Sequence, residues 1–458
     1  MNNSDRLSGM RGFTVIWLGQ LVSMLGTGMT NFALSFYIFE QTGQASALTI
    51  AIFCFVAPSI ILSPLAGALV DRWNRKVVII MTDLAAGIVT LVWLAIVLTN
   101  GNLDMWQIYL GNIITGAFNA MQFPAFSAAV SLMIPKEQFA RAAGMLDFAG
   151  AASNILAPAF AGALLGTFGL VPIMLVDVIT FLFAILAVLV VHMPQPATEM
   201  IPEGNKRPSL REDSLFGFKY IRERPSLLGL QFVFTALNFI SAFGAIIATP
   251  MILARTGNSA ASLATVQSIA AFGGVAGGLI MSAWGGPKRK VQGVLLGMSA
   301  ENLLGPIVIG LAKAVPGWAA GSFMSQLFIP IINGSNQAIW QSKVPPAIQG
   351  RVFATRRMIA QISFPVAVLI AGPLADKVFE PAMSSDGWAA AIFGPIVGTG
   401  AGAGMSLMIL LSGIVGVVIG LVGYSIPALR DVEDIMPDFD ALTAPIVNNE
   451  PAIQSQGE

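Results

Sequence analysis

Three acidic side chains, Asp147, Asp177 and Glu301, lie inside long apolar stretches of the chain. A carboxyl group in such a stretch can bind a proton on one side of a membrane and release it on the other as access changes. We expect Asp177 about seven residues inside one end of its stretch and Glu301 near the middle of another, with Asp83 close to an end of a third. The alternative is a structural carboxyl group that hydrogen-bonds to neighbouring hydroxyls. These residues therefore predict either proton coupling or helix packing.

Uncharged polar side chains recur at helical spacing in four of the apolar stretches. Steps of three or four residues place each set on one helix face, where it can bind a solute or hydrogen-bond to another helix. The candidates for solute binding are Gln20, Thr27, Asn31, Asn112, Asn119, Gln122, Gln231, Asn238, Gln326, Asn333 and Asn336. Aromatic residues such as Phe36, Phe118 and Phe239 accompany them, which favours a bulky amphiphilic solute.

Other chemistries lack the residues that they need. A single cysteine, Cys54, and a single histidine, His192, exclude an internal disulfide and a His/Cys metal cluster. The sequence contains no G-x-x-x-x-G-K-[ST] run for nucleotide hydrolysis and no nucleophile with a base and an orienting group. Its net charge is zero, which provides no basic field for nucleic acid. We therefore expect no enzyme activity, no cofactor, no metal and no nucleic-acid partner, with a proton gradient as the energy source.

The composition requires a membrane protein. Of the 458 residues, 55% are apolar and only 10% are charged, where a soluble domain carries roughly 25% charged residues. The first apolar run is too long for a signal peptide. At about 20 residues per crossing, we predict twelve transmembrane helices, at 13–39, 45–70, 77–99, 106–133, 141–166, 170–192, 226–254, 259–284, 291–312, 317–341, 355–376 and 403–427.

The charges predict the orientation of these helices. Of the 24 Lys and Arg residues, all except Arg255, Lys313 and Lys377 fall on the side of both termini, which is therefore expected to be cytoplasmic. The predicted organisation is an N-terminal segment (1–12), a six-helix bundle (13–192), a cytoplasmic linker (193–225), a second six-helix bundle (226–427) and a disordered cytoplasmic tail (428–458). A Gly- and Ala-rich segment, 380–402, is expected to fold over the outer face.

The two halves also repeat. Pro135 and Arg141 recur 210 residues later as Pro345 and Arg351, in the corresponding cytoplasmic loop of each half. A duplicated 6+6 bundle is an architecture in which the substrate binds near the midplane between halves that rock to alternate access. The predicted fold is therefore all-α, with two pseudo-symmetric six-helix bundles.

The loop after the second crossing carries a recognisable motif. Residues 67–76, GALVDRWNRK, resemble the G-x-L-x-D-R-x-G-R-K signature of the major facilitator superfamily, with Asn74 where the family prefers glycine. The GGPKRK run at 285–290 and the GPLAD stretch at 372–376 resemble the macrolide-efflux branch of the drug:proton antiporters. The resemblance implies a gating latch between the halves, made by Gly67, Asp71, Arg72 and Arg75. We expect Asn74 to adopt a left-handed turn.

A second motif lies in the fifth predicted helix. Its small residues and proline resemble the G-x8-G-x3-G-P-x2-G-G pattern of facilitator antiporters, with Gly144, Pro158 and Gly162 as the matching positions and serine or alanine at three others. Small residues at this spacing allow close helix packing, and ordinary membrane packing is the alternative interpretation. The resemblance also implies that the passage is lined by the first, fourth, seventh and tenth helices, where the polar candidates lie.

Together these features predict a secondary exporter of a hydrophobic or amphiphilic small molecule, such as a macrolide-like drug or a metabolite, by proton antiport. The alternatives are a lipid or lysolipid flippase, a siderophore or metabolite exporter on the same fold, and a membrane sensor that does not transport. We expect a monomer in the plasma (inner) membrane that contacts lipids and its amphiphilic substrate. The proton carrier is the least defined part, since the fourth helix lacks the arginine of many proton antiporters.

Overall fold

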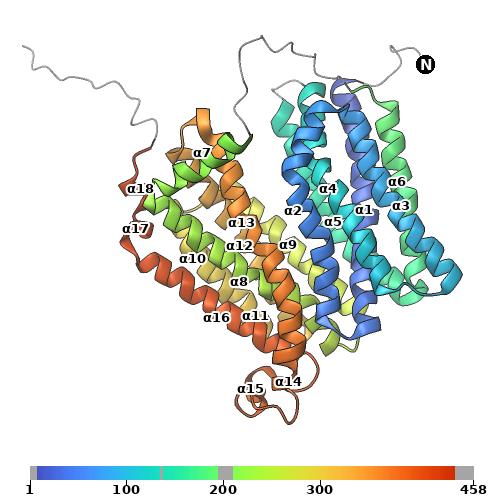
Figure 1. Cartoon of the computed structure of the whole chain (residues 1–458). Coiled ribbons are helices and arrows are strands. Elements are labelled where there is room, and N and C mark those ends of the chain that lie inside the picture. Colours follow the sequence, from blue (N-terminus) through green and yellow to red (C-terminus); the bar gives the residue numbers. More distant parts are fainter. Residues whose placement is uncertain (1–7, 135–137, 194–209, 439–458) are drawn as a thin grey trace, which may run out of the picture.

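Long helices build the structure, a computed structural model that describes residues 8–134, 138–193 and 210–438 (Figure 1). In these ranges every element of two or more residues is helical. The N-terminal bundle contains α1 (Gly9–Thr42), α2 (Ala45–Arg72), α3 (Arg75–Asn100), α4 (Met105–Met133), α5 (Phe139–Phe168) and α6 (Leu170–Val190). The C-terminal bundle contains α8 (Pro225–Arg255), α9 (Ala260–Trp284), α10 (Lys290–Leu304), α11 (Pro306–Leu311), α12 (Val315–Lys343), α13 (Pro346–Leu374) and α16 (Ala403–Ser425).

The prediction of twelve crossings is confirmed. Eleven helical spans in the described ranges are long and apolar enough to cross a membrane, and α4, which carries no charged residue over its 29 positions, is the twelfth. The ninth crossing is split into α10 and α11 at Gly305, where a Cβ atom would lie 2.7 Å from the Cβ of Ser325 on α12. The next residue, Pro306, has no N–H to continue the hydrogen-bond ladder. Close approach to α12 and the proline therefore explain this break.

The two bundles pack their helices in the same pattern. In the N-terminal half α1 packs against α5 and α6, while α4 packs against α2 and α3. The corresponding pairs of the other half are α8 with α13 and α16, and α12 with α9 and α10. Figure 1 shows the halves as two groups of ribbons that spread apart at one end and meet at the other. The repeated packing supports the duplication that the sequence repeat predicts.

The ends of the bundles differ in how they meet. We call the end where α1 begins and α16 ends the terminal face, and the end of the α1–α2 connection the distal face. Near the distal face, one buried apolar cluster contains residues of both halves, among them Phe36 of α1 and Ile246 of α8. Towards the terminal face the buried clusters belong to one half each, around Val78 in the N-terminal half and Trp340 in the C-terminal half. The halves are therefore joined distally and apart towards the terminal face, as their ribbons show in Figure 1.

The chain between the bundles contains a helix that the sequence analysis did not predict. Within the expected linker, α7 (Leu210–Arg222) buries Tyr220 and Ile221 against the C-terminal bundle. The hydroxyl of Tyr220 donates a hydrogen bond of 3.4 Å to the carbonyl of Lys343. Because this segment is rich in charged residues, its sequence indicated a polar linker and not a helix with an apolar face.

The expectation of a disordered tail from residue 428 is wrong for the described part of that segment. The short helices α17 (Pro427–Arg430) and α18 (Val432–Ile435) bury Leu429 and Val432. Glu433 accepts a hydrogen bond from the backbone N–H of Val291, and Arg289 forms an ion pair with Asp434. The acidic tail is held because it faces the basic start of α10, a partner that its own composition does not reveal.

The π-helix η3 (Ala375–Phe379) follows α13 and leads into the distal segment 380–402. This segment contains α14 (Glu380–Ala382) and α15 (Ala390–Val397). Glu380 accepts hydrogen bonds from the backbone N–H groups of Gly402 and Met405, which holds both ends of the segment together. Trp388 is 75% exposed. The segment therefore forms a small folded cap on the distal face, as expected.

Candidate functional site

Two helix pairs join the halves near the distal face. In the first pair, Gly162 of α5 lies against α9, where a Cβ atom on this glycine would be 2.5 Å from the Cβ of Ala264. Nearer the middle of the same pair, the hydroxyl of Ser268 donates a hydrogen bond of 2.9 Å to the carbonyl of Ile155. α5 and α9 therefore touch from the distal face to about mid-depth.

The second pair is α2 with α13. The carboxylate of Asp376, which follows α13, accepts hydrogen bonds from the backbone N–H groups of Ala45 (3.0 Å) and Ser46 (2.7 Å). These are unsatisfied N–H groups at the start of α2, where the helix dipole also favours a negative charge. Gly372, one turn earlier, approaches so closely that a Cβ atom there would lie 2.2 Å from the hydroxyl oxygen of Thr49. These contacts close the distal face at α2 and α13.

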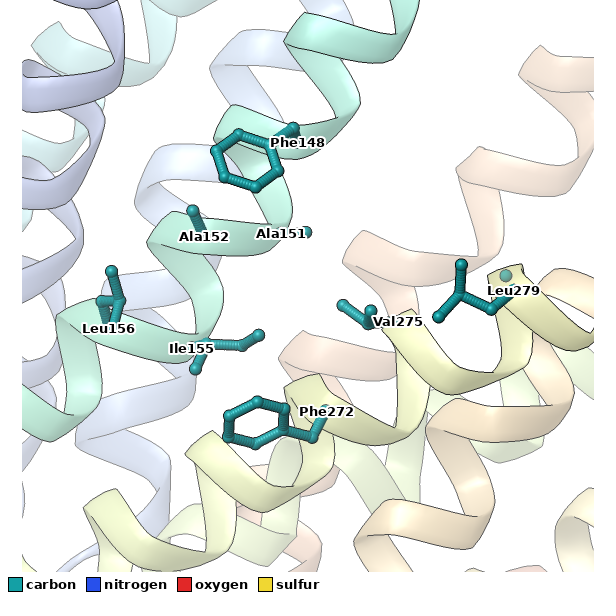
Figure 2. Close-up of a pocket in the computed structure, with 9 residues that line it drawn as sticks. Phe148, Ala151, Ala152, Ile155, Leu156, Phe272, Val275 and Leu279 are labelled. Atoms are coloured by element: carbon teal, nitrogen blue, oxygen red, sulfur yellow. The ribbon is translucent and has the colours of Figure 1, made fainter.

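Towards the terminal face from the contact of Gly162 with α9, an apolar groove of about 500 Å³ lies between α5 and α9. Figure 2 shows its lining side chains projecting from the two facing helices. They are Phe148, Ala151, Ala152, Ile155 and Leu156 of α5 and Phe272, Val275, Gly278 and Leu279 of α9. Phe148 and Phe272 are 61% and 55% exposed. The groove can accept an apolar or amphiphilic molecule between the halves.

A buried carboxyl group joins three helices of the N-terminal bundle. Asp83 of α3 is 5% exposed and accepts hydrogen bonds from the side-chain amides of Gln20 of α1 (2.8 Å) and Gln122 of α4 (3.1 Å). Gln122 in turn accepts a bond of 3.3 Å from the exposed Asn119, whose carbonyl oxygen accepts a bond of 3.3 Å from Ser59 of α2. Three predicted solute-binding residues are thus linked to a buried acid.

The C-terminal bundle contains a corresponding acid. Glu301 of α10 is 6% exposed and accepts hydrogen bonds from Ser325 of α12 (2.5 Å) and Ser241 of α8 (3.5 Å). The neighbouring Asn302 donates to the same carboxylate at 2.8 Å. Glu301 therefore joins α10, α12 and α8, the helices that correspond to α3, α4 and α1 of the N-terminal half, but the 210-residue repeat pairs Asp83 with Gly293, so the two acids lie at different depths along their helices.

The other two predicted proton carriers have different surroundings. Asp177 of α6 is 4% exposed and accepts hydrogen bonds of 3.0 Å from Thr27 of α1 and Thr90 of α3. Asp177 therefore holds α6 to α1 and α3, and Thr27 contributes to that junction. The side chain of Asp147 lies outside the part of α5 that the structure describes.

The remaining polar candidates differ in burial and in hydrogen bonding. Asn112 donates to the carbonyl of Ala51 at 2.9 Å and joins α4 to α2, while the buried Gln231 donates to Thr235 and to the carbonyl of Arg356. Asn336 is 1% exposed, and its amide has no hydrogen-bond partner in the described ranges. Asn31 and Asn333 are exposed, and Asn238 and Gln326 are half-buried. Their roles in solute binding stay predictions.

The predicted latch is described in part. Asn74 has extended backbone angles (φ −63°, ψ 114°), so the expectation of a left-handed turn is wrong. Its side chain instead caps α3 by accepting from the N–H groups of Lys76 (3.0 Å) and Val77 (3.4 Å). Arg75 is half-buried at the first position of α3, and the side chains of Gly67, Asp71 and Arg72 lie outside the described part of α2. The latch contacts themselves stay a prediction.

The second motif lies on α5. Ser153 donates to the carbonyl of Met24 at 2.9 Å, and Ala157 packs against Gly28, so this part of the motif holds α5 to α1. Pro158 lies inside the helix and Gly162 faces α9, while the side-chain position of Gly144 falls outside the described residues. The small residues therefore join α5 both to its own half and to the other half.

Sequence reasoning did not assign a role to Asp376 or Ser325, and it placed Ser241 only among the polar residues of the seventh helix that could line the passage. Asp376 belongs to the GPLAD stretch that carried the family resemblance, yet its partners lie 330 residues away in the chain. Nothing in the local sequence identifies such a contact. Among the residues that the structure describes, no group of three His, Cys, Asp or Glu side chains could hold a metal ion.

Comparison with known proteins supports a transport protein. Macrolide efflux protein A of Streptococcus pyogenes is 27% identical over 378 residues, which cover 80% of this chain and 90% of that protein. Multidrug resistance protein MdtG of Escherichia coli is 23% identical over 384 residues, or 79% and 86% of the two chains.

Solved structures share the fold. A bacterial homologue of the human lysosomal transporter Spinster, in an inward-facing and unoccupied conformation, matches with a TM-score of 0.64 at 15% identity, over 92% of this chain and 97% of that one. The nucleoside transporter NupG matches with a TM-score of 0.65 at 12% identity, over 90% and 98%. The family model described as Major Facilitator Superfamily matches residues 16–368. This chain therefore belongs to the major facilitator superfamily of membrane transporters.

Proposed function

We propose that this transporter exports hydrophobic or amphiphilic small molecules, such as macrolide-like drugs, in exchange for protons. The similarity to macrolide and multidrug efflux proteins over about four fifths of the chain supports this substrate class. The proposed driving force is a proton gradient, with no cofactor, and the proposed working unit is a monomer in the plasma membrane.

The observation that carries the proposal is the asymmetric contact between the halves. They meet at the distal face through Asp376 and Gly162, and they separate towards the terminal face around an apolar groove. Among the residues that the structure describes, the Lys and Arg residues other than Arg255, Lys313 and Lys377 belong to segments at the terminal face, which favours the cytoplasm for that side. An apolar solute would then enter from the cytoplasm or the inner leaflet, and rocking of the halves would expose it on the other side.

Drug accumulation in a drug-sensitive strain tests this function. Cells that express the chain should accumulate less labelled erythromycin and less ethidium than cells with an empty vector, and a protonophore should abolish the difference. Asp71→Asn, which removes the acid of the predicted latch, should also abolish it if the protein is present in the membrane at the same level. Unchanged accumulation of every compound would contradict drug export, and export that resists the protonophore would contradict proton antiport.

A lysolipid flippase is the second candidate. The groove between α5 and α9 favours it, because its lining is apolar throughout and Phe148 and Phe272 are largely exposed. An acyl chain could occupy such a groove while its headgroup moves between the halves. In this case, fluorescent lysolipid would cross the membrane of proteoliposomes without a pH gradient, whereas labelled erythromycin would not.

A further inference from the structure

The buried carboxyl group of Asp83 differs from the other described acids in the kind of hydrogen-bond donor that surrounds it. Both of its oxygens accept from side-chain amides, Gln20 at 2.8 Å and Gln122 at 3.1 Å. Asp177 accepts from the hydroxyls of Thr27 and Thr90. A hydroxyl can rotate from donor to acceptor, but an amide has one donor end and one acceptor end.

This difference determines what a bound proton would do. A proton on Asp177 can be accommodated when a threonine hydroxyl rotates, and a proton on Glu301 when Ser325 or Ser241 rotates. A proton on Asp83 turns one of its oxygens into a donor, which then faces an amide N–H₂ group. The hydroxyl oxygen still accepts through its remaining lone pair, but its O–H can donate along the same contact only when Gln20 or Gln122 turns its amide through half a rotation. Protonation of Asp83 therefore changes the hydrogen bonding of α1 or α4.

On α4 the change extends to the surface of the bundle. The bonds all run in one direction, from the hydroxyl of Ser59 to Asn119, from Asn119 to Gln122, and from Gln122 to Asp83. A turned Gln122 would present its N–H₂ group to the N–H₂ group of Asn119. Asn119 is exposed and must then also turn or lose its bond. The state of a buried proton is thus connected to an exposed polar side chain and to α2.

The surroundings of Asp83 supply no cation to hold its charge. Asp83 forms no ion pair in the described ranges, and α4 contains no charged residue. On α6, the acidic Asp177 bonds to Thr90, two turns further along α3. Maintaining an unpaired carboxylate inside a membrane is costly, which favours transient binding of a proton.

Among the described residues, the cations on the helices around Asp83 lie at a distance along those helices. Arg11 precedes Gln20 by nine residues on α1, about 13 Å of helix. At the start of α3, Arg75 and Lys76 precede Asp83 by eight and seven residues, and Lys76 donates to the carbonyls of Leu189 and Val191 at the end of α6, next to His192. The side chains of Asp71 and Arg72 at the end of α2 fall outside the described residues.

We propose that Asp83 is the proton-binding group of the N-terminal bundle, and that Gln20 and Gln122 transmit its protonation to the side chains that contact the exported molecule. The inference rests on the proposed proton antiport. In the outward-open state Asp83 takes a proton from the external solution, and in the conformation described here it releases that proton to the cytoplasm. No other group needs to be oxidised, reduced or covalently modified.

Proteoliposomes test this site through two measurements on the same protein: accumulation of labelled erythromycin driven by a pH gradient, and exchange of labelled for unlabelled erythromycin at equal pH. Asp83→Asn has the shape of the protonated acid but cannot release a proton. We expect its ratio of accumulation to exchange to fall at least tenfold. Asp83→Glu should recover part of that ratio, and Asp177→Asn should keep it within twofold of the unmodified protein.

The outcomes separate the inference from the function. If the unmodified protein accumulates erythromycin and Asp83→Asn keeps the same ratio, the role of Asp83 is wrong while proton antiport stands. If the unmodified protein shows no pH-driven accumulation, proton antiport itself fails. Should Asp83→Asn lose exchange as well, Gln122→Met retains the acid and removes the amide. It should lower the ratio at least threefold, and an unchanged ratio in Gln122→Met overturns the inference.

Discussion

The carboxylate of Asp376, directly after α13, accepts a hydrogen bond of 2.7 Å from the backbone N–H of Ser46 in the first turn of α2. The same carboxylate accepts from Ala45, so one side chain of the C-terminal half caps a helix of the N-terminal half. The predicted latch places a second acid, Asp71, at the other end of α2. The helix pair α2 and α13 thus carries an acid at the end of each helix.

Removal of the Asp376 carboxylate should open the distal face. Hydrogen bonds to a charged group contribute roughly 1.5–3 kcal/mol each, less where water has access, so Asp376→Ala should raise the open population about tenfold. In a Cys54→Ser background, a cysteine in place of Phe36, which lies in the buried distal cluster, would report this opening. An impermeant maleimide added to whole cells should label it faster in Asp376→Ala. Lys377→Gln is the control, and equal labelling rates in the two variants would contradict the role of Asp376.

The contact between α5 and α9 should be sensitive to one glycine and not to the next. A Cβ atom at position 162 would lie 2.5 Å from the Cβ of Ala264, so the side chain of Gly162→Val would clash with α9. A Cβ atom at position 166, one turn later, would have no such neighbour within 4 Å. We expect Gly162→Val to prevent distal closure and to reduce erythromycin export at least tenfold. Gly166→Val should export normally. Equal export by two variants of equal abundance would show that this contact is not needed.

The apolar groove should contribute to substrate affinity. Phe148 and Phe272 are largely exposed, so Phe148→Ser and Phe272→Ser should leave the fold intact while removing apolar contact with the solute. A loss of about 1 kcal/mol corresponds to a rise of roughly fivefold in the apparent KM for erythromycin. Phe168 on the same helix is 69% exposed but lies at the distal end, so Phe168→Ser is the matched control. A KM that Phe148→Ser and Phe272→Ser leave unchanged would remove the groove from the substrate path.

The capping role of Asn74 predicts a graded effect on stability. Loss of an N-cap side chain costs about 1 kcal/mol when alanine replaces asparagine, but only a few tenths when glycine does. Asn74→Ala should therefore lower the melting temperature in detergent by more than Asn74→Gly, which restores the residue that the family prefers. If Asn74→Gly were the less stable variant, the side chain would not act as a cap.

The positions of the helices could be predicted from the sequence because each crossing needs a long apolar run. All twelve predicted crossings have a helix. The sequence shows Pro306, but proline is tolerated inside other crossings, so the break at Gly305 depends also on the close approach of Ser325 on α12. The docking of α17 and α18 depends on Arg289, which is distant in the chain.

The candidate site could be predicted by residue type but not by partner. Polarity in an apolar run identifies Gln20, Gln122 and Asp177, yet the rotation of each helix decides what such a side chain meets. Gln20 and Gln122 both donate hydrogen bonds to Asp83, whereas Thr27 donates to Asp177. Equal spacing therefore led to one predicted group of solute-binding residues where the structure has at least two separate junctions.

Proton movement coupled to the drug tests the central claim most directly. Inside-out membrane vesicles that contain the transporter can be energised by respiration until their interior is acidic, and a quenched fluorescent amine then reports the pH gradient. Addition of erythromycin should release protons and restore fluorescence in a concentration-dependent manner, only when the transporter is present. If labelled erythromycin enters the vesicles while fluorescence stays quenched, the transporter does not exchange drug for protons.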